Sequence, residues 1–315
     1  MNFVIKLAML ICSLCVSLVL AEGAAQVYVN HVVMQTKLFE PDSVLGWKMI
    51  SNLDTKRRNS DGEIWTIKTD EHGIRGNARW ESNARKVLIA GDSFAFGDGV
   101  NIEDRFDGVI EEKGYQVITL GVIGYGSDQA LLMARPYYEK LNAGDIFIIM
   151  TCYNDFWDLA KQWHSGRSKV WYELIDEKLV KHDPVVTWSI KLRDKSYLWS
   201  KASSLFGSEE FTPEQILQAS RIYDSLVSAD ALELKRKGVR VLLAYFGLGN
   251  IPEKLLRHQL EDNINSLCEQ LNIKCISIDN KLSSQENCFL KDGHWNKKGN
   301  YLVGKILLDE IDQVQ

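Results

Sequence analysis

The sequence is poor in the residues that mark several specialised classes of protein. It has five prolines in 315 residues and no low-complexity segment, which argues against a fibrous or largely disordered chain. Basic residues do not outnumber acidic ones: 37 Lys and Arg face 42 Asp and Glu, the formal charge is −5, and no basic run is longer than Lys56-Arg57-Arg58. Dedicated nucleic-acid binders carry a basic face, so we expect no nucleic-acid partner.

Cysteine is also scarce, and its spacing gives no metal motif in the body of the chain. Two of the six cysteines lie near the N-terminus, and the other four are Cys152, Cys268, Cys275 and Cys288. None of these four forms a CxxC or Cys/His pair with the spacing of a zinc site, so we expect no metal and no organic cofactor. In an oxidising compartment we expect one disulfide among the last three; its pairing is open, and four buried thiols are the alternative.

Long apolar runs are missing except at the N-terminus. Lys6 is followed by fifteen uncharged residues, 7–21, and then by small residues at 23–25. The run is shorter than the ~18 residues of a membrane-spanning helix and predicts a secretory signal over residues 1–25. The alternative is an uncleaved anchor, because the apolar residues 3–5 lengthen the stretch past Lys6. In both cases we expect an exported protein, periplasmic or secreted, that meets a membrane only through this segment.

Short apolar runs alternate with helical patterns from residue 86 onward. Runs at 87–90, 117–120 and 146–150 begin about thirty residues apart, the length of a βαβ unit, and runs at 239–246 and 275–278 add two more strands. Unbroken apolar strands are typical of a parallel sheet that is covered on both faces. The pattern predicts a doubly wound α/β sandwich with five strands.

Two intervening helices have clear signals. Residues 212–215 form a capping box with proline at the first helical position, and Gly238 closes that helix. An apolar stripe predicts a second helix packed on the sheet; it consists of Leu256, Leu260, Ile264, Leu267 and Leu271.

Two segments do not fit the alternation, which divides the chain into a lead-in and a main domain over 85–315. Residues 26–84 contain strand-like pieces and turn signals, and we interpret them as a small β lead-in region. Residues 156–211 form an insertion after the third strand that holds five of the nine tryptophans: Trp157, Trp163, Trp171, Trp188 and Trp199. Such an insertion can form a lid or a substrate wall, or its tryptophans can simply anchor a cap.

A serine and a histidine stand where a hydrolytic site needs them. The first strand runs into Gly91-Asp92-Ser93-Phe94, and the carboxyl ends of parallel strands are where open α/β sheets bind ligands. A serine nucleophile needs a base, and His294, in Asp292-Gly293-His294 before the last helix, can supply one with Asp292 accepting its Nδ1 proton. Alternatively, these two are ordinary loop residues. The other histidines have no neighbouring motif: His31, His72, His164, His182 and His258.

Donors for an oxyanion follow the next two strands. The glycine-rich turn at 121–126 can present backbone N–H groups, and Asn154 can offer its amide from the same edge of the sheet. Glycine turns and Asn-Asp pairs also occur for purely structural reasons.

The ordered set of Ser, Gly, Asn and His blocks resembles the SGNH or GDSL superfamily of esterases, lipases and acyltransferases, and within it a bacterial exported subgroup. The resemblance covers residues 86–310 and implies a flavodoxin-like three-layer α/β/α fold. It implies that Ser93 is the nucleophile, that His294 is the base and that Asp292 orients His294. The oxyanion hole would consist of the Ser93 N–H, the Gly124 N–H and the Asn154 amide.

The chain departs from the usual pattern of that superfamily at three places. Only Gly293 separates Asp292 from His294, a spacing similar to that of the related polysaccharide acetyltransferases. Thr119 stands where asparagine is common, and Cys152 stands where glycine is common. Cys152 therefore places a thiol near the site, with the remote alternative that it is the nucleophile.

These features predict a serine esterase that removes small acyl groups, most simply acetyl, from a carbohydrate or cell-envelope ester. The alternatives are an O-acyltransferase with the same acyl-enzyme, a lysophospholipase or lipase, and a non-catalytic glycan-binding module. The expected partner is a small-molecule or polysaccharide ester. The candidate substrate-binding residues are Asp92, Tyr125, Trp157 and Trp295.

Overall fold

The computed structural model has one central parallel sheet, built from the five apolar runs that the sequence indicates. It describes residues 3–33, 37–76, 79–80, 84–185, 187–193, 196–204, 211–282, 285 and 287–313. The strand order is β13-β12-β7-β5-β6, and every neighbouring pair is parallel. The strands are β5 (Lys86–Gly91), β6 (Gln116–Gly121), β7 (Ile146–Cys152), β12 (Arg240–Phe246) and β13 (Lys274–Ser277). The predicted five-stranded α/β fold is confirmed.

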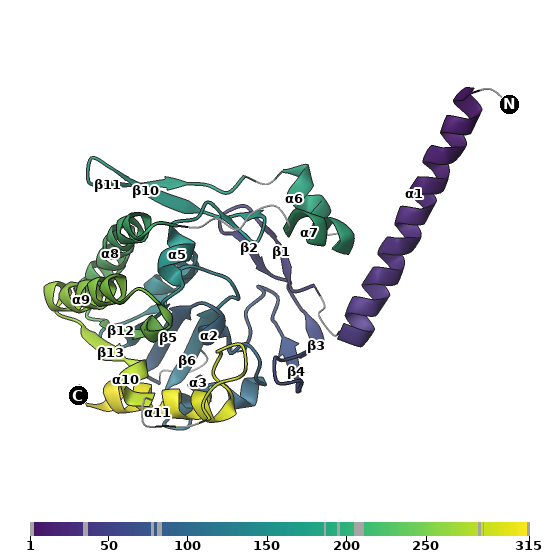
Figure 1. Ribbon diagram of the computed structural model, residues 1–315. Helices are drawn as coiled ribbons and strands as arrows, with labels where there is room; N and C mark the ends of the chain where they lie inside the picture. The colour runs from purple at the N-terminus through teal and green to yellow at the C-terminus, as the bar shows by residue number, and fades with distance from the viewer. Residues whose placement is uncertain are drawn as a thin grey trace.

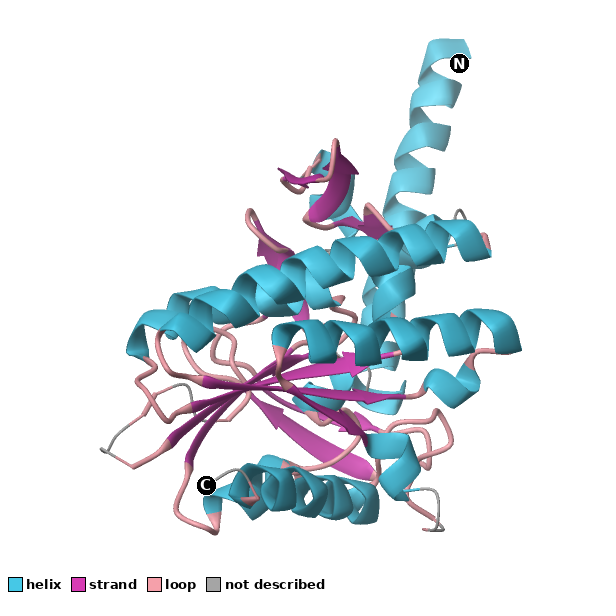
Figure 2. Ribbon diagram, turned by 90° about the vertical axis from the view of Figure 1, so that its left-hand side faces the viewer, coloured by secondary structure: helices cyan, strands magenta, loops and turns pink. Residues whose placement is uncertain are grey.

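Helices cover both faces of this sheet and complete three layers (Figure 2). One face packs against α4 (Ser127–Ala134), α5 (Asp155–Leu159), α8 (Pro213–Arg236) and α9 (Lys254–Leu271). The other packs against α3 (Asp107–Glu111), α10 (Ile278–Leu282) and α11 (Lys297–Asp312). Short helices α2 (Ser93–Phe96), η2 (Ile102–Asp104), η3 (Arg135–Lys140) and η4 (Leu248–Asn250) lie in the connections. Each layer buries one stripe of a helix against one face of the sheet, which is what stabilises this architecture.

The two helices with clear sequence signals form as predicted. Thr212 and Gln215 cap α8 reciprocally, and the left-handed Gly238 follows its end. The five residues of the apolar stripe on α9 are all buried. Cys268 of α9 forms a disulfide with Cys275 of β13, which resolves the pairing that the sequence leaves open.

The lead-in region forms two antiparallel hairpins. They are β1 (Phe39–Asp42) with β2 (Gly46–Met49), and β3 (Asp54–Arg58) with β4 (Ile64–Lys68). Their buried side chains, among them Trp47 and Trp65, share a core cluster with Phe96 of α2 and with Tyr125. The hairpins therefore support the turn that follows β5. The division of the chain at residues 84 and 85 stays a prediction, and the adjacent residues 81–83 lie outside the described part.

One buried arginine ties the lead-in region to that turn. Arg75 is 2% exposed, and its guanidinium donates to the carbonyl oxygens of Phe96 and Gly97 at 2.8 Å and of Val100 at 2.6 Å. Its plane lies over the Trp65 ring, 4.9 Å from the centroid. A planar cation with several donors can satisfy carbonyl groups that no strand partner reaches.

The insertion after β7 contains two more hairpins and two helices. They are β8 (Trp163–His164) with β9 (Arg167–Ser168), β10 (Trp171–Ile175) with β11 (Lys178–His182), α6 (Trp188–Arg193) and α7 (Tyr197–Ser204). Residues 186, 194–195 and 205–210 of the predicted insertion lie outside the described part. Lys169, fully buried, forms an ion pair with Asp128 of α4 and donates to the Asp158 carbonyl oxygen, so this part of the insertion is fastened to the α/β body.

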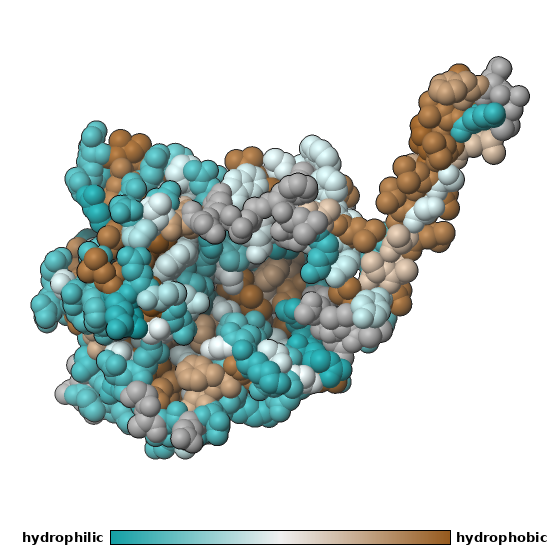
Figure 3. Space-filling model, viewed as in Figure 1, coloured by the Kyte–Doolittle hydropathy of each residue, from teal (hydrophilic) through white to brown (hydrophobic). Residues whose placement is uncertain are grey.

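The N-terminal segment forms a long helix that extends from the body (Figure 1). Helix α1 (Phe3–Tyr28) continues into the π-helical turn η1 (Val29–Val33), and α1 has no buried residue. Figure 3 shows that α1 is mainly hydrophobic, whereas the face of the body in that view is mostly hydrophilic. In the described part of the chain, Phe3–His31 is the one helix long and apolar enough to cross a membrane. A signal sequence and an anchor both meet that description.

Candidate active site

Ser93 lies at the sharp turn between β5 and α2. Asp92 is the N-cap of α2, and its Oδ1 accepts a hydrogen bond from the Phe94 N–H at 2.9 Å. The turn lies tightly against β6: a Cβ on Gly121 would be 2.1 Å from the Phe96 nitrogen, so only glycine fits there. Ser93 is 9% exposed and follows the carboxyl end of β5, with only Asp92 between them, so it lies at the edge of the sheet.

His294 reaches this serine from the loop before α11. Its Nε2 lies 2.8 Å from Ser93 Oγ, within hydrogen-bond distance. The imidazole ring rests against Phe94, with 4.8 Å between the ring centroids, and Phe94 in turn packs against Trp295 and Phe246. The backbone is fixed by a bond from the Leu290 N–H to the His294 carbonyl oxygen at 2.8 Å. The structure thus brings together the serine and histidine that the sequence singles out, over 201 positions of chain.

Asp292 approaches His294 less closely than a conventional partner. Its Oδ1 lies 3.2 Å from His294 Nδ1, inside ion-pair range, but the two groups are not aligned for a hydrogen bond, and the buried Nδ1 has no such partner among the described residues. Oδ1 instead accepts the His294 backbone N–H at 3.2 Å. The Asp292 side chain is 45% exposed. Alignment decides hydrogen bonding, so the contact between Asp292 and the His294 ring is electrostatic in this structure.

The lead-in region holds the same loop from outside. The Lys291 N–H donates to Asp61 Oδ1 at 3.0 Å, and the Asp292 N–H donates to Ser60 Oγ at 3.2 Å. Both acceptors lie in the turn between β3 and β4. The placement of His294 therefore depends on a segment that precedes the α/β body in sequence.

Asp98 is a second carboxylate near His294, and the sequence analysis did not identify it. Burial raises its pKa, while the charges of His294 and Arg57 act in the opposite direction. Its own backbone N–H donates to the Ser93 carbonyl oxygen at 3.0 Å. The signal was present in the sequence, because Asp98 lies five residues after Ser93 in the same turn, but nothing there indicates which way its side chain faces.

The predicted oxyanion donors follow the two strands that flank β5, with β6 on one side of it and β7 on the other. Gly124 has φ +80°, a conformation that favours glycine, in the turn after β6. Asn154 follows β7, and its Nδ2 donates to Asp158 Oδ2 at 3.2 Å. One of the two amide protons of Asn154 is thereby fixed, which sets the orientation of the other.

Asp158 is the centre of a polar group that the sequence analysis missed. It accepts from Lys161 Nζ at 2.8 Å and pairs with His164 Nδ1 at 3.0 Å, besides the Asn154 amide. Burial opposes ionisation of Asp158, but the hydrogen bonds and charges of His164 and Lys161 hold its pKa below the usual range. Asp158 is therefore an ionised, buried acceptor that orients Asn154.

His164 brings the insertion to the edge of this site. A Cβ on Gly124 would lie 2.9 Å from His164 Nε2, so the imidazole fills the space beside the Gly124 turn. Its other face lies near Trp47 of the lead-in, with 5.7 Å between centroids. The sequence did not indicate a role for His164. Its partner Asp158 lies six positions earlier, and that spacing does not place two residues on the same face of a regular helix.

Two buried carboxyl groups lie beneath the site. Burial raises the pKa of Asp92 to about 6, and it raises that of Asp155 well above the ordinary value, with the charges of Asp92 and Asp158 adding to the second effect. Each has one oxygen, Asp92 Oδ2 and Asp155 Oδ1, without a hydrogen-bond partner among the described residues. A protonated carboxyl group carries its own donor, and it avoids the cost of a second buried charge.

Three of the four candidate substrate-binding residues are buried, which corrects the expectation for them. Asp92 is 1% exposed, Trp295 is 3% exposed, and Tyr125 is fully buried with its hydroxyl donating to the Trp47 carbonyl oxygen at 2.6 Å. In this structure they pack beneath the surface of the site and do not line it. Trp157 is half-buried, and its ring contacts that of Tyr153 edge-on with 6.1 Å between centroids.

The two unusual motif residues also have structural surroundings. Cys152 is buried, and burial together with the charges of Asp92 and Asp155 raises the pKa of its thiol well above the ordinary value. Its reactive thiolate is therefore strongly disfavoured. Thr119 Oγ1 donates to Asp107 Oδ2 at 2.8 Å, beside the buried pair of Asp107 with Arg105.

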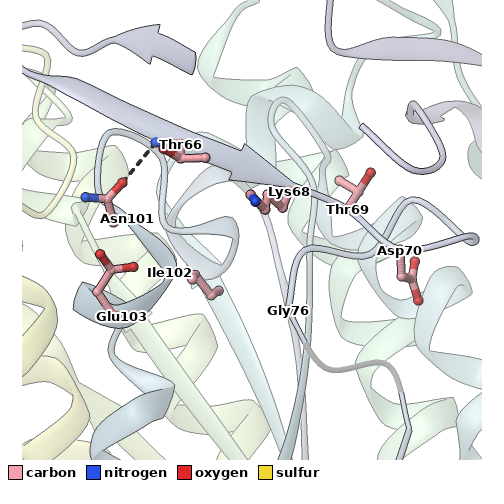
Figure 4. A pocket seen from close by; sticks show the side chains of 8 residues that line it. All are labelled: Thr66, Lys68, Thr69, Asp70, Gly76, Asn101, Ile102 and Glu103. Carbon is pink, nitrogen blue, oxygen red and sulfur yellow. Dashed lines mark hydrogen bonds between the residues drawn. The ribbon is translucent and has the colours of Figure 1, made fainter. Parts of the chain in front are cut away.

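A cavity of about 550 Å³ lies elsewhere, between β4 and η2. Figure 4 shows its lining, with Lys68 and Asp70 on one side and Asn101 and Glu103 on the other. It contains neither Ser93 nor His294, and the geometry of nucleophile and base outweighs its size as a guide to the site. Among the described residues, no cluster of three or more His, Cys, Asp or Glu side chains has the arrangement of a metal site, and the absence of a cofactor stays a prediction.

The structural neighbours of this chain are G-D-S-L lipolytic proteins and esterases. A member of the lipolytic protein G-D-S-L family from Veillonella parvula DSM 2008 is 12% identical, with TM-score 0.47, over 73% of this chain and 100% of its own. The psychrotrophic esterase EstA from Pseudoalteromonas sp. is 14% identical, with TM-score 0.46, over 73% and 97%. An acetyl xylan esterase from Geobacillus stearothermophilus is 15% identical, with TM-score 0.41, over 72% and 94%.

No protein-family model matches the sequence, and no curated protein is significantly similar to it. At these identities and scores, the likeness to solved structures carries no conclusion about activity. The functional assignment rests on the geometry of the site.

Proposed function

We propose that the protein is a serine ester hydrolase of the SGNH type, with Ser93 as nucleophile and His294 as general base. The observation that carries the proposal is the 2.8 Å contact between His294 Nε2 and Ser93 Oγ at the carboxyl end of a central parallel strand. A serine hydroxyl is a weak nucleophile, and an imidazole within hydrogen-bond distance is what activates it.

In the proposed reaction, Ser93 Oγ attacks the ester carbonyl carbon while its proton passes to His294 Nε2. The C–O bond to the leaving alcohol then breaks, and the alcohol takes that proton, which leaves an acyl-serine. Water repeats the two steps: it adds to the acyl carbon, gives a proton to His294 and releases the carboxylic acid with Ser93 restored. The ester and water are converted into the alcohol and the carboxylic acid, and Ser93 and His294 regain their starting protonation. No co-reactant besides water is needed.

The proposed oxyanion hole consists of the N–H groups of Ser93 and Gly124 and the amide of Asn154. It is supported by the bond from Asn154 to the ionised Asp158, because a fixed amide can stabilise developing charge without reorganising. Asp292 is assigned an electrostatic role, in keeping with its exposed side chain and its missing hydrogen bond.

The proposed substrate is an O-acyl, most simply acetyl, ester of a carbohydrate or a cell-envelope polymer. Its support is the half-buried Tyr153 and Trp157, which flank Asn154 and can stack against a sugar ring. Because the acyl-enzyme is shared with O-acyltransfer, and the short Asp292-Gly293-His294 spacing favours that alternative, the experiment must separate water from a sugar hydroxyl as acceptor.

The experiment supplies an acetylated oligosaccharide or a simple acetyl ester and measures free acetate and acetylated acceptor together. Wild type is expected to release acetate, and Ser93→Ala is expected to release none above background. Equal activity in the two proteins would refute the assignment. Acetylation of an added oligosaccharide in preference to acetate release would reassign the protein to transfer, and a preference for long acyl chains would indicate a lipase.

A further inference from the structure

One carboxylate, that of Glu22, connects α1 to the insertion by hydrogen bonds. Glu22 lies within α1, and it accepts hydrogen bonds from the Tyr197 N–H at 2.6 Å, the Leu198 N–H at 3.0 Å and Ser196 Oγ at 2.8 Å. Tyr197 and Leu198 are the first two residues of α7. The first N–H groups of a helix have no partner within the helix, so Glu22 caps α7 from a segment about 175 residues away.

This contact bears on whether α1 is removed. The predicted signal covers residues 1–25, and its loss would delete the carboxylate and leave the first turn of α7 uncapped. Cleavage after Ala21 would instead place a free ammonium group on Glu22 itself, beside N–H groups that need an acceptor. Loss of residues 1–25 would therefore remove the cap, and cleavage after Ala21 would place a positive charge beside it, so the cap favours a chain in which α1 stays attached.

Helix α1 has the dimensions of an anchor. Residues 3–21, the part of α1 that precedes Glu22, give a length of about 28 Å at 1.5 Å each, close to the hydrocarbon core of about 30 Å. Its charged residues are Lys6 near one end and Glu22 near the other, with an uncharged run between them. Its surface is mainly hydrophobic in Figure 3, with a hydrophilic group near the N-terminal end. Such a surface is stable in lipid and unstable in water.

Two exposed tryptophans lie on α6 and α7, in the insertion that Glu22 contacts. Trp188 of α6 is 72% exposed and Trp199 of α7 is 38% exposed, and their rings lie 6.3 Å apart. Leu192 and Leu198 add exposed apolar surface on the same two helices. Figure 1 shows α7 beside α1 and α6 next to α7, and the Glu22 contacts place the start of α7 near the end of the uncharged run of α1. Indole rings are enriched at this depth, the interface between lipid tails and water.

We propose that α1 is retained as a membrane anchor and that α6 and α7 rest in the lipid interface beside it. The face formed by Trp188, Leu192, Leu198 and Trp199 binds the headgroup region of the bilayer. The α/β body is thereby held at a fixed orientation over the membrane surface, and the substrate of the Ser93 site has to be reachable from there. The proposal does not depend on the chemistry of that site.

Intact mass tests retention. The full chain is expressed with export, the membrane fraction is extracted with detergent, and the mass of the purified protein is measured. The expected mass includes residues 1–21. A protein that begins at residue 22 or 26 and is found in the soluble fraction would overturn the proposal.

Quenching of tryptophan fluorescence by brominated lipid tests the seating of α6 and α7. The full chain is reconstituted into phosphatidylcholine vesicles with and without bromine on the acyl chains. The variant carrying Trp188→Phe and Trp199→Phe is expected to lose most of the quenching. Trp163→Phe is the matched control, because Trp163 is 41% exposed but lies on the β8 hairpin, and it should leave quenching unchanged. Equal quenching in all three proteins would contradict the proposal.

Glu22→Ala separates the cap from the anchor. The variant should remain in the membrane, while proteolysis of the α6–α7 segment becomes faster and the quenching of its tryptophans weaker. Glu253→Ala is the control, since Glu253 is exposed at the start of α9 and makes no side-chain capping bond. Unchanged proteolysis in Glu22→Ala would refute the junction. Concentration-dependent crosslinking through α6 and α7 in place of quenching would assign the face to a second copy of the chain.

Discussion

Two of the histidine–carboxylate pairs in the described part of the chain lie at the candidate site, and the better-formed of these two is not the one that contacts Ser93. His164 bonds to Asp158 at 3.0 Å, and Asp158 is 3% exposed. His294 lies 3.2 Å from Asp292, which is 45% exposed and misaligned, yet only His294 Nε2 is within reach of Ser93 Oγ. A buried, aligned pair has the larger interaction energy, but a base is identified by the proton it can reach. The comparison supports the proposed roles, proton transfer for His294 and orientation of Asn154 for Asp158.

Replacing each histidine in turn should give the largest difference in kcat between the two pairs. His294→Gln removes the base and is expected to lower kcat by about 10⁴-fold or more, as for other members of serine triads. His164→Gln should cost far less, because its Nε2 faces Gly124 and not the serine. Steady-state kinetics on a simple acetyl ester measures both. A larger loss in His164→Gln would reverse the assignment.

Variants of the proposed oxyanion hole should show the next largest effect on kcat. Asn154→Ala is expected to lower kcat by about 10²- to 10³-fold with little change in KM, because the lost donor acts on charge that develops in the transition state. Asp158→Asn should produce a part of the same loss, since Asp158 only orients Asn154. In the double variant the two losses should not add, because they act through one amide. Additive losses would mean that Asp158 acts independently of Asn154.

Asp292→Asn should have a small effect for a residue in a catalytic motif. An exposed ion pair contributes about 0–1 kcal/mol, so we expect kcat to fall by no more than about fivefold. The readout is kcat at low and high salt, because screening should remove the difference between the variant and wild type. A loss comparable to that of His294→Gln would show that Asp292 forms a true hydrogen bond with His294 during the reaction.

Asp92 lies within reach of the charges of both pairs and gives the last prediction, which concerns stability and not kcat. Burial raises its pKa from 3.8 to about 6, with the charge of Asp158 adding to the increase and that of His294 opposing it. The folded state therefore binds the proton more tightly than the unfolded state. This contribution is fully present below pH 3.8 and is lost as the pH rises through about 6.

Asp92→Asn keeps the side-chain acceptor for the cap but removes the titration. The free energy of unfolding of the variant, relative to that of wild type, should increase as the pH rises from 4 to 7, because only wild type loses the contribution of the bound proton. Urea denaturation across that range measures it. Asp292→Asn, on the exposed loop, serves as the comparison variant. Parallel curves for Asp92→Asn and wild type would show that Asp92 is not protonated in the folded protein.

The sheet and the serine–histidine contact were predictable, because both follow from local patterns. Apolar runs of four to eight residues predict buried strands, and residues directly after parallel strands must meet at one edge. The blocks around Ser93 and His294 carry this information in their immediate neighbours. The apolar stripe of α9 and the capping box of α8 were likewise predictable, because each depends on residues three or four positions apart in the sequence.

The remaining contacts could not be predicted, because they join segments whose approach depends on the folded whole. Arg75 meets the carbonyl groups of the nucleophile turn only after the lead-in has packed on Phe96. His164 meets Gly124 only because the insertion folds back over the sheet edge. Burial of Tyr125 and Trp295 was missed for the same reason, since aromatic residues beside a motif look alike whether they face a substrate or the core.

The most direct measurement weighs the intact protein after exposure to a fluorophosphonate, which reacts only with an activated serine. Wild type and Asp292→Asn should each gain one adduct, at similar rates, while Ser93→Ala gains none and His294→Gln reacts far more slowly. That result would identify His294 as the group that activates Ser93. An adduct on Ser93→Ala, or an equal rate in wild type and His294→Gln, would contradict the account.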